Sequence, residues 1–414
     1  MYTKRHLDNG IPVVMEQLKS FRSVILGIWV KVGARNETPD KNGVSHFLEH
    51  MFFKGTRKRT AHDIAIEIDS LGGDLNAFTS RENTAFYIKV LDEYVERGAE
   101  LLSDIFLHSL LDSEEVEKEK GVIKEEIKMV EDTPDDYIHD LFSRTVWGNE
   151  GLGYPVLGKR ETIRAFTRDD LLHHVRKYYG TADTVISCAG NFDPDQVLGI
   201  LNHYLGGLRR GSEPESFPAP AFRQEIAVFP KDLSETHICL GVEGLPYASD
   251  DRYTLAILNT LLGSSVSSRL FQEIREKKGY AYSIYSFVSS YRDAGYWAVY
   301  AGTGKKKAVT VTEMIINEMR SLHETLTEKE LQRAKDQLKG NLILGLDSTS
   351  SRMQSIARQE MYCGRHFSQK EIMKEVEGVT LRHIRDLAHR LINEGKMSMT
   401  VLGPAKGEDF EGLF

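Results

Sequence analysis

The segment LDSEEVEKEKGVIKEEIKMVED (residues 111–132) recurs in altered form as LTEKELQRAKDQLKGNLILGLD (residues 326–347). The two segments align without a gap at a constant offset of 215 residues. The identical positions include Leu111, Glu115 and Asp132 in the first copy, which match Leu326, Glu330 and Asp347 in the second. A recurrence of this length indicates an internal duplication of the chain rather than a short local motif.

The order of expected elements supports the duplication. The first half begins with IPVVMEQ and SVILGIWVKVGA, which are rich in β-branched residues and typical of strands, and helical segments follow. After a stretch dense in Gly, Pro and Ser, EIAVFPKD and THICLGVEGLP open the second half in the same way. We therefore predict two homologous α+β domains, each a mainly antiparallel sheet with helices packed on it. Their expected bounds are 1–208 and 223–414, with a linker at 209–222.

Composition narrows the class of protein. A length of 414 residues favours two or three domains of roughly 150 to 200 residues. A net charge of −8 argues against nucleic acid as a partner. Three scattered cysteines without a CxxC pair fit a reducing compartment, and neither a signal peptide nor an apolar run of membrane-spanning length is visible. We expect a cytoplasmic protein without a membrane partner.

Three polar residues in VSHFLEHMFFKGT (residues 44–56) form the first candidate site. On a helix, His46, Glu49 and His50 lie within one arc of about 100°. Two imidazoles four residues apart can bind one metal ion, and a catalytic zinc needs a third protein ligand and an open position. In the helix expected downstream, Glu119 and Glu126 lie inside an apolar stripe, where a carboxylate is costly unless it is paired or binds a metal.

Each of these features has an ordinary alternative. A histidine pair at this spacing is more often structural or solvated, and glutamates in a charged helix usually face solvent. The duplication discriminates between these interpretations. Glu119 and Glu126 fall opposite Ala334 and Asn341, and the stretch RYTLAILNTLLGSS, opposite the histidines, contains no histidine. The polar set is therefore a property of the first copy alone, and we predict one metal site per chain.

Three stretches, GVSHFLEHMFFKGT, GGDLNAFTSRENTAFY and EKEKGVIKEEIKMVEDTP, resemble the pitrilysin/insulinase family of inverted-motif (HxxEH) zinc peptidases. Within it, the chain is most similar to the catalytic β subunit of mitochondrial processing peptidase and its bacterial homologues. The resemblance covers essentially the whole chain. It implies that His46, His50 and Glu126 bind one Zn²⁺. It also implies that Glu49 is the general base that acts on zinc-bound water, and that Glu119 orients a metal ligand or the metal site.

The resemblance also implies residues that bind substrate. Asn76 and Ala77, in LNAFT, would lie on an edge strand that pairs with the main chain of a peptide. Arg275 and Tyr282, in REKKGYAY, would hold the substrate backbone and stabilise the oxyanion. From the residues alone, the first stretch is equally an ordinary strand, and the second a charged helix end followed by an aromatic residue in a strand.

The predicted function is that of a zinc-dependent endopeptidase that cleaves unfolded or extended peptides inside a chamber. The family resemblance implies a homodimer. The absence of a glycine-rich insertion in LLGSSVSSRLFQ favours a stand-alone bacterial protein over a subunit of an organelle enzyme. Whether Arg275 and Tyr282 act on the zinc site of their own chain or of a second chain stays open. One alternative is a non-catalytic scaffold or assembly subunit of the same family. Another is a metal-dependent hydrolase of small molecules.

Overall fold

The computed structural model describes residues 1–211 and 218–413, so the centre of the predicted linker lies outside the described residues. By its contacts the chain divides into two compact units, and each unit combines segments from both halves of the sequence. Unit 1 contains residues 1–129, a stretch that begins at Tyr154, and residues 345–366. Unit 2 contains residues 130–153, residues 218–344 and the chain from Phe367 onward.

Unit 1 is built on a six-stranded sheet with the strand order β1-β2-β6-β3-β5-β4. Strands β2 and β6 pair in parallel, and the other neighbouring strands are antiparallel. This order leaves β4 at one edge of the sheet. The strands are β1 (Tyr2–His6), β2 (Pro12–Gln17), β3 (Ser23–Val30), β4 (Asp74–Thr79), β5 (Thr84–Leu91) and β6 (Thr184–Gly190).

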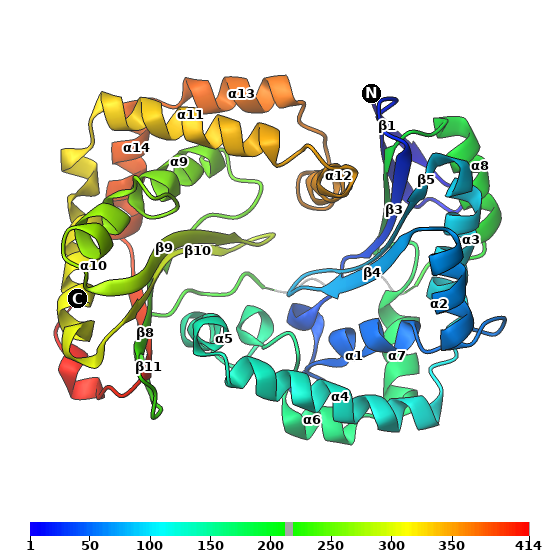
Figure 1. The fold of residues 1–414 in the computed structure, drawn as a ribbon, viewed down its shortest axis with the longest axis horizontal. Helices are drawn as coiled ribbons and strands as arrows, with labels where there is room; N and C mark the ends of the chain where they lie inside the picture. Colours follow the sequence, from blue (N-terminus) through cyan, green and yellow to red (C-terminus); the bar gives the residue numbers. More distant parts are fainter. Residues whose placement is uncertain (212–217, 414) are drawn as a thin grey trace. The chain divides into compact units, whose positions relative to one another are not determined.

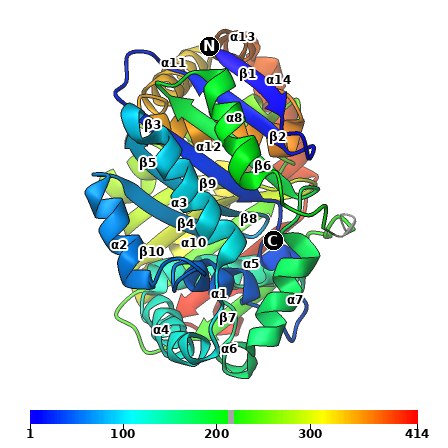
Figure 2. The ribbon, with the colours of Figure 1, turned by 90° about the vertical axis from the view of Figure 1, so that its right-hand side faces the viewer.

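Helices cover both faces of the unit 1 sheet. Alternate residues of β3 point to opposite faces, so Leu26 and Ile28 join one core cluster and Ile25 and Trp29 another. Helices α3 and α8 pack on the first face and α12 on the second, as Figures 1 and 2 show. The helices of this unit are α1 (Val44–Phe52), α2 (Ala61–Ser70), α3 (Val95–His108), α4 (Ser113–Glu131, whose last residues cross into unit 2), α6 (Arg160–Ala165), α7 (Arg168–Tyr178), α8 (Pro194–Leu205) and α12 (Thr349–Cys363).

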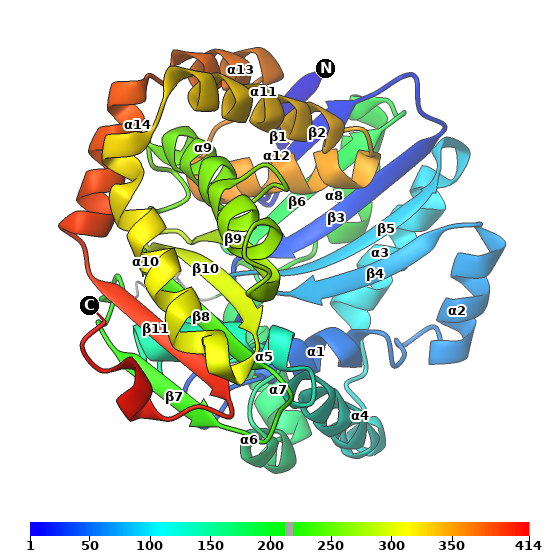
Figure 3. The same cartoon turned by 60° about the vertical axis from the view of Figure 1, so that its left-hand side comes forward.

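Unit 2 has a five-stranded sheet with the order β7-β11-β8-β10-β9. Its strands are β7 (Ile226–Pro230), β8 (Thr236–Glu243), β9 (Ala281–Ser290), β10 (Gly295–Thr303) and β11 (Met397–Gly403). Helices α9 and α10 pack on one face, where they lie in front of the strands in Figure 3, and α5 packs on the other. The helices are α5 (Pro134–Trp147), α9 (Arg252–Leu262), α10 (Ala308–Thr325), α11 (Glu328–Leu344), α13 (Gln369–Gly378) and α14 (Leu381–Ala388).

The two sheets confirm the predicted duplication and the α+β fold class. Strands β2, β6, β3, β5 and β4 recur in unit 2 as β7, β11, β8, β10 and β9, with the same spatial order and the same parallel pair. Unit 1 differs by the additional edge strand β1. Within the described residues, no helix is both long enough and apolar enough to cross a membrane.

The units differ from contiguous halves because two helices are exchanged between the halves of the sequence. Helix α5 belongs to the first half, yet its residues Phe142 and Val146 are buried in a cluster with Tyr296 and Ala298 of β10. Helix α12 belongs to the second half and packs Met353 in a cluster with Trp29, on the sheet of unit 1. Each sheet therefore has its second apolar face covered by a helix from the other half of the sequence. The predicted domains, 1–208 and 223–414, would instead have kept each helix with the sheet of its own half.

Candidate metal centre

The two histidines lie on the polar side of helix α1, because the apolar residues on its opposite side are buried in the core. Val44, Phe47, Leu48 and Met51 are buried in the core of unit 1. Their spacing of three, four and seven residues forms one stripe of an α-helix. The polar residues of the HxxEH motif therefore lie together on the other side of a helix whose orientation the core determines.

A buried carboxylate supports the first turn of α1. The residue before the helix, Gly43, has φ +96° and has no side chain to cap the helix. A Cβ at Gly43 would lie 2.7 Å from the Cα of Gly158, so only glycine fits there. Glu37 takes the capping role, because its two carboxylate oxygens accept hydrogen bonds from the N–H of Gly43 (2.7 Å) and of Ser45 (2.8 Å). Burial raises the pKa of Glu37, and the hydrogen bonds from Ser45, Gly43 and Asn42 oppose that shift.

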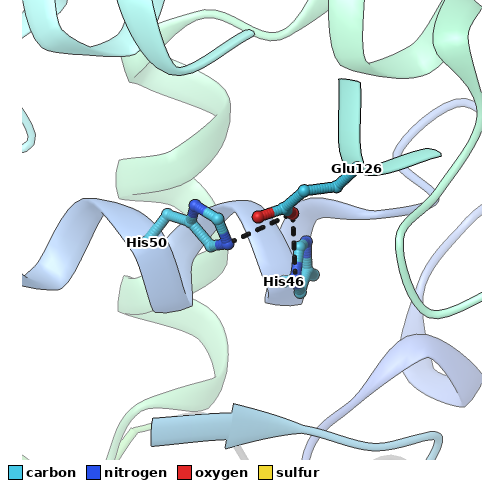
Figure 4. A group of neighbouring side chains, drawn as sticks. All are labelled: His46, His50 and Glu126. Atoms are coloured by element: carbon cyan, nitrogen blue, oxygen red, sulfur yellow. Dashed lines mark ion pairs between the residues drawn. The ribbon is translucent and has the colours of Figure 1, made fainter. Parts of the chain in front are cut away.

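The structure brings His46, His50 and Glu126 together, as Figure 4 shows. One ligand atom from each residue lies within 4.8 Å of the other two. Oε2 of Glu126 is 3.8 Å from Nε2 of His46 and 3.5 Å from Nε2 of His50. Helices α1 and α4 thus supply all three groups, and all three lie in unit 1.

Glu119 contacts the opposite side of His50. Its Oε1 lies 2.7 Å from Nδ1 of His50, and its Oε2 lies 2.6 Å from Nζ of Lys54. Burial raises the pKa of Glu119, but these two contacts outweigh burial and hold the pKa below its usual value. An ionised carboxylate only accepts hydrogen bonds, so Nδ1 of His50 carries a proton, and in the neutral imidazole the lone pair lies on Nε2, toward Glu126.

The pKa values of the two histidines are shifted in opposite directions. Burial, followed by the charge of His50, lowers the pKa of His46 to about 3, against the charge of Glu119. Burial also acts to lower the pKa of His50, but its hydrogen bond to Glu119 and the charges of Glu126, Glu119 and Glu49 together raise it. At neutral pH, His46 is a neutral imidazole whose lone pair is available to a metal ion. Its Nδ1 is buried without a hydrogen-bond partner in the described part of the chain.

Glu49 lies on the same side of α1 and is held by the edge strand β4. The hydroxyl of Thr79, the last residue of β4, donates a 2.6 Å hydrogen bond to Oε2 of Glu49. Burial raises the pKa of Glu49, while the Thr79 hydrogen bond and the charge of His50 oppose the rise. A half-buried carboxylate of raised pKa beside the histidines is suited to accept a proton.

The donor set fits zinc. Two imidazole nitrogens and one carboxylate oxygen are the ligands of many catalytic zinc sites, which keep a fourth position open. Tetrahedral bonds of about 2.0 to 2.1 Å would separate the ligand atoms by about 3.3 Å. The separations of Glu126 from the two histidines, 3.5 and 3.8 Å, approach that value, and all three ligand atoms lie within 4.8 Å of one another. The contact between Glu119 and His50 also has the form that commonly fixes the tautomer of a metal-binding histidine.

The residues expected to bind substrate lie in both units. Asn76 and Ala77 are in β4, at the sheet edge of unit 1, where Asn76 is exposed and Ala77 half-buried. Arg275 and Tyr282 lie in unit 2, Arg275 in the short helix η4 (Phe271–Glu276) and Tyr282 in β9. Both are exposed, and Arg275 lies over the ring of Phe271. The role of this pair toward a substrate stays a prediction.

Unit 2 contains the duplicated helices without the polar set. Ala334 is buried and Asn341 is exposed on α11, the counterpart of α4. Among the residues that the structure describes, His46, His50 and Glu126 form the only group of three that could hold a metal ion.

Comparison with known proteins agrees with the fold and identifies the family. Residues 12–160 match the insulinase family, peptidase family M16, and residues 165–338 match the M16 inactive domain. An uncharacterized zinc protease of Bacillus subtilis is 43% identical over 388 residues, which cover 94% of this chain and 95% of that protein. The chain therefore belongs to the insulinase (M16) peptidase family, which confirms the resemblance seen in the sequence.

Two solved structures share the fold. A protease from Helicobacter pylori superposes with a TM-score of 0.90 at 23% identity, covering 97% of this chain and 99% of that one. A chain of complex III2 from Candida albicans gives a TM-score of 0.86 at 21% identity, covering 100% and 97%. At these identities the likeness concerns the fold alone. Since a protease and a chain of complex III2 share it, the residues of the site must decide the function.

Sequence reasoning did not identify three residues that support the site, namely Glu37, Lys54 and Thr79. Lys54 lies two residues beyond the end of α1, so helical spacing does not account for its contact with Glu119. The contacts of Glu37 and Thr79 depend on how distant segments pack, and no sequence pattern indicated them.

Proposed function

We propose that this protein is a zinc-dependent endopeptidase that cleaves extended or unfolded peptides. The observation that carries the proposal is the convergence of Nε2 of His46 and Nε2 of His50 on one oxygen of Glu126, with Glu49 on the same side of α1. Catalytic zinc sites commonly combine three such ligands with a nearby carboxylate base. The names of the relatives as zinc proteases support this proposal.

The chemistry follows from the roles of the side chains. When bound, zinc supplies a water molecule of lowered pKa and a Lewis acid for the peptide carbonyl. Glu49 accepts the proton of the attacking water and passes it to the leaving amine. Glu119 keeps Nδ1 of His50 protonated, so that Nε2 faces the metal, and Lys54 keeps Glu119 in place.

The edge strand supports a peptide as substrate. Strand β4 pairs on one side with β5, and none of the described strands pairs with the main chain on its other side. An extended peptide can add to such an edge through main-chain hydrogen bonds, which are independent of side-chain identity. Asn76 and Ala77 would be the pairing residues. A hydrolase of small molecules would have no need of this edge.

The assembly is part of the same proposal. The family resemblance supports a homodimer that encloses the peptide, with Arg275 and Tyr282 as further substrate contacts. Cys188 and Cys239 are buried free thiols, which suits a cytoplasmic setting. Sedimentation of the zinc-loaded protein tests the dimer. A second experiment mixes a Glu49→Gln variant with an Arg275→Ala, Tyr282→Phe variant. If Arg275 and Tyr282 of one chain act at the zinc site of the other chain, activity returns in mixed dimers although each variant alone is inactive.

The alternative function is a non-catalytic subunit, and the fold shared with a complex III2 chain is the observation that favours it. A complete set of metal ligands, such as His46, His50 and Glu126 form here, would have no purpose in such a subunit. Zinc analysis of the purified protein separates the two functions, since a scaffold needs no bound zinc.

Substitution of the base tests the endopeptidase function. We expect Glu49→Gln to retain zinc and to lose cleavage of an unfolded peptide by several orders of magnitude, because the ligands remain and the base is removed. Glu125→Gln is a matched control, because Glu125 is an exposed glutamate of α4. Substantial turnover by zinc-loaded Glu49→Gln, or no cleavage of any peptide by the zinc-loaded wild type, would contradict the proposal.

A further inference from the structure

Thr79 connects two parts of the site that lie 30 residues apart in the sequence. It is the last residue of β4, and its hydroxyl donates to Oε2 of Glu49 on α1 at 2.6 Å. Because side chains alternate along a strand, Thr79 points to the same face as Leu75 and Ala77, which pack against the core that also contains α1. The direction of the Thr79 side chain is therefore set by the sheet.

The hydrogen bond constrains the carboxylate of Glu49. A hydroxyl that donates to a carboxylate at this distance forms a strong, charge-assisted bond. It occupies Oε2 and limits rotation of the group about its last torsion angle, so Oε1 keeps one direction. Without the hydroxyl, the half-buried carboxylate keeps only the weaker backbone contact with Thr79, and its broad terminal torsion is less restricted.

We propose that Thr79 is a positioning residue, which aligns the Glu49 carboxylate with the peptide that adds to β4. This inference rests on the proposed function, because it deepens the role of the same site. Asn76 and Ala77 belong to the same strand as Thr79. The strand that would pair with the peptide therefore also contacts the general base Glu49. A movement of β4 relative to α1 would then change the position of the peptide and the orientation of the base together.

The expected effect is on turnover rather than on binding. Misplacement of a reacting group by about 1 Å can cost on the order of 10²-fold in rate. The peptide pairs with main-chain groups of β4, which a change of the Thr79 side chain leaves intact. Loss of the hydroxyl should therefore lower kcat and leave KM and zinc content almost unchanged.

Two substitutions isolate the hydroxyl. Thr79→Val keeps the shape and β-branching of threonine and removes the donor, whereas Thr79→Ser keeps the donor. We expect kcat of Thr79→Val to fall by roughly 10- to 100-fold with KM within about twofold of the wild type. Thr79→Ser should retain most of the wild-type kcat. An unchanged kcat in Thr79→Val, a loss of zinc, a change in KM alone, or an equal loss in Thr79→Ser would each overturn the proposal.

A second measurement needs no peptidase activity. Urea unfolding of zinc-loaded wild type, Thr79→Val, Glu49→Gln and the double variant forms a double-mutant cycle. If Thr79 holds Glu49, the two single shifts in the urea midpoint will not add in the double variant, and additive shifts overturn the proposal. A zinc-loaded wild type that cleaves no peptide refutes the proposed function instead, and the cycle still decides whether Thr79 holds Glu49.

Discussion

Glu119 lies 2.7 Å from Nδ1 of His50 and so determines which nitrogen of that imidazole faces Glu126. The carboxylate is almost fully buried, at 3% exposure, and its second oxygen is paired with Lys54 at 2.6 Å. His50, Glu119 and Lys54 thus form one chain of charge-assisted contacts behind the candidate zinc ligands. Such partners of metal-binding histidines contribute to metal affinity without touching the metal.

We predict that Glu119→Gln weakens zinc binding by roughly 10- to 100-fold, because the amide can offer His50 only a weaker, neutral acceptor. Competition with a chelator of known affinity measures the change. Glu117→Gln, on the exposed side of the same helix, is the control and should bind zinc as the wild type does. Equal zinc affinity of Glu119→Gln and the wild type would show that the contact plays no part in metal binding.

The cap of α1 gives a second prediction. In Glu37→Gln, the amide group can accept through one oxygen only, so one of the N–H groups of Gly43 and Ser45 loses its partner. An unsatisfied buried donor costs about 1 to 3 kcal/mol. We expect the free energy of unfolding to fall by that amount, and zinc affinity to fall with it, because the turn before His46 loosens. Urea unfolding and zinc titration measure both, with Asp40→Asn, an exposed neighbour, as control.

The duplication gives a prediction about stoichiometry. Ala334 and Asn341 stand where Glu119 and Glu126 stand in the first copy, so unit 2 has no equivalent ligand set. After removal of loosely bound metal, elemental analysis should find about one zinc per chain. Glu126→Ala should bring this close to zero, and Asn341→Ala should leave it unchanged. Two tightly bound zinc ions per chain would require a second site.

The sequence predicted those features that follow from local rules. Helical spacing alone placed His46 and His50 on one side of a helix, and the internal repeat predicted two homologous α+β domains. The exchange of α5 and α12 was not predicted, because an amphipathic pattern shows that a helix has an apolar face but not which sheet covers that face. The contact of Thr79 with Glu49 was hidden for a similar reason, since it depends on where β4 ends relative to α1.

The buried His174 of α7 predicts how stability depends on pH. Its Nε2 lies 3.4 Å from Oγ of Ser45, the residue before His46, and its side chain is only 6% exposed. Burial, with smaller contributions from the charges of Lys177 and His173, lowers the pKa of His174 to about 3. The folded state therefore keeps this histidine neutral at pH values at which the unfolded chain, with a pKa near 6.5, binds a proton.

The sign follows from the proton count. Below about pH 6.5 the unfolded state binds the additional proton, so His174 makes the free energy of unfolding fall by at most about 1.4 kcal/mol per pH unit, down to about pH 3. Its stabilising contribution is complete above pH 6.5 and declines as the pH falls. Urea unfolding at pH 7 and pH 5 measures how far the free energy of unfolding falls between the two pH values. We expect this fall to be about 2 kcal/mol smaller in His174→Gln than in the wild type. His173→Gln, which changes the exposed neighbour, should keep the wild-type difference. The same pH dependence in all three proteins would show that His174 titrates alike in the folded and unfolded states.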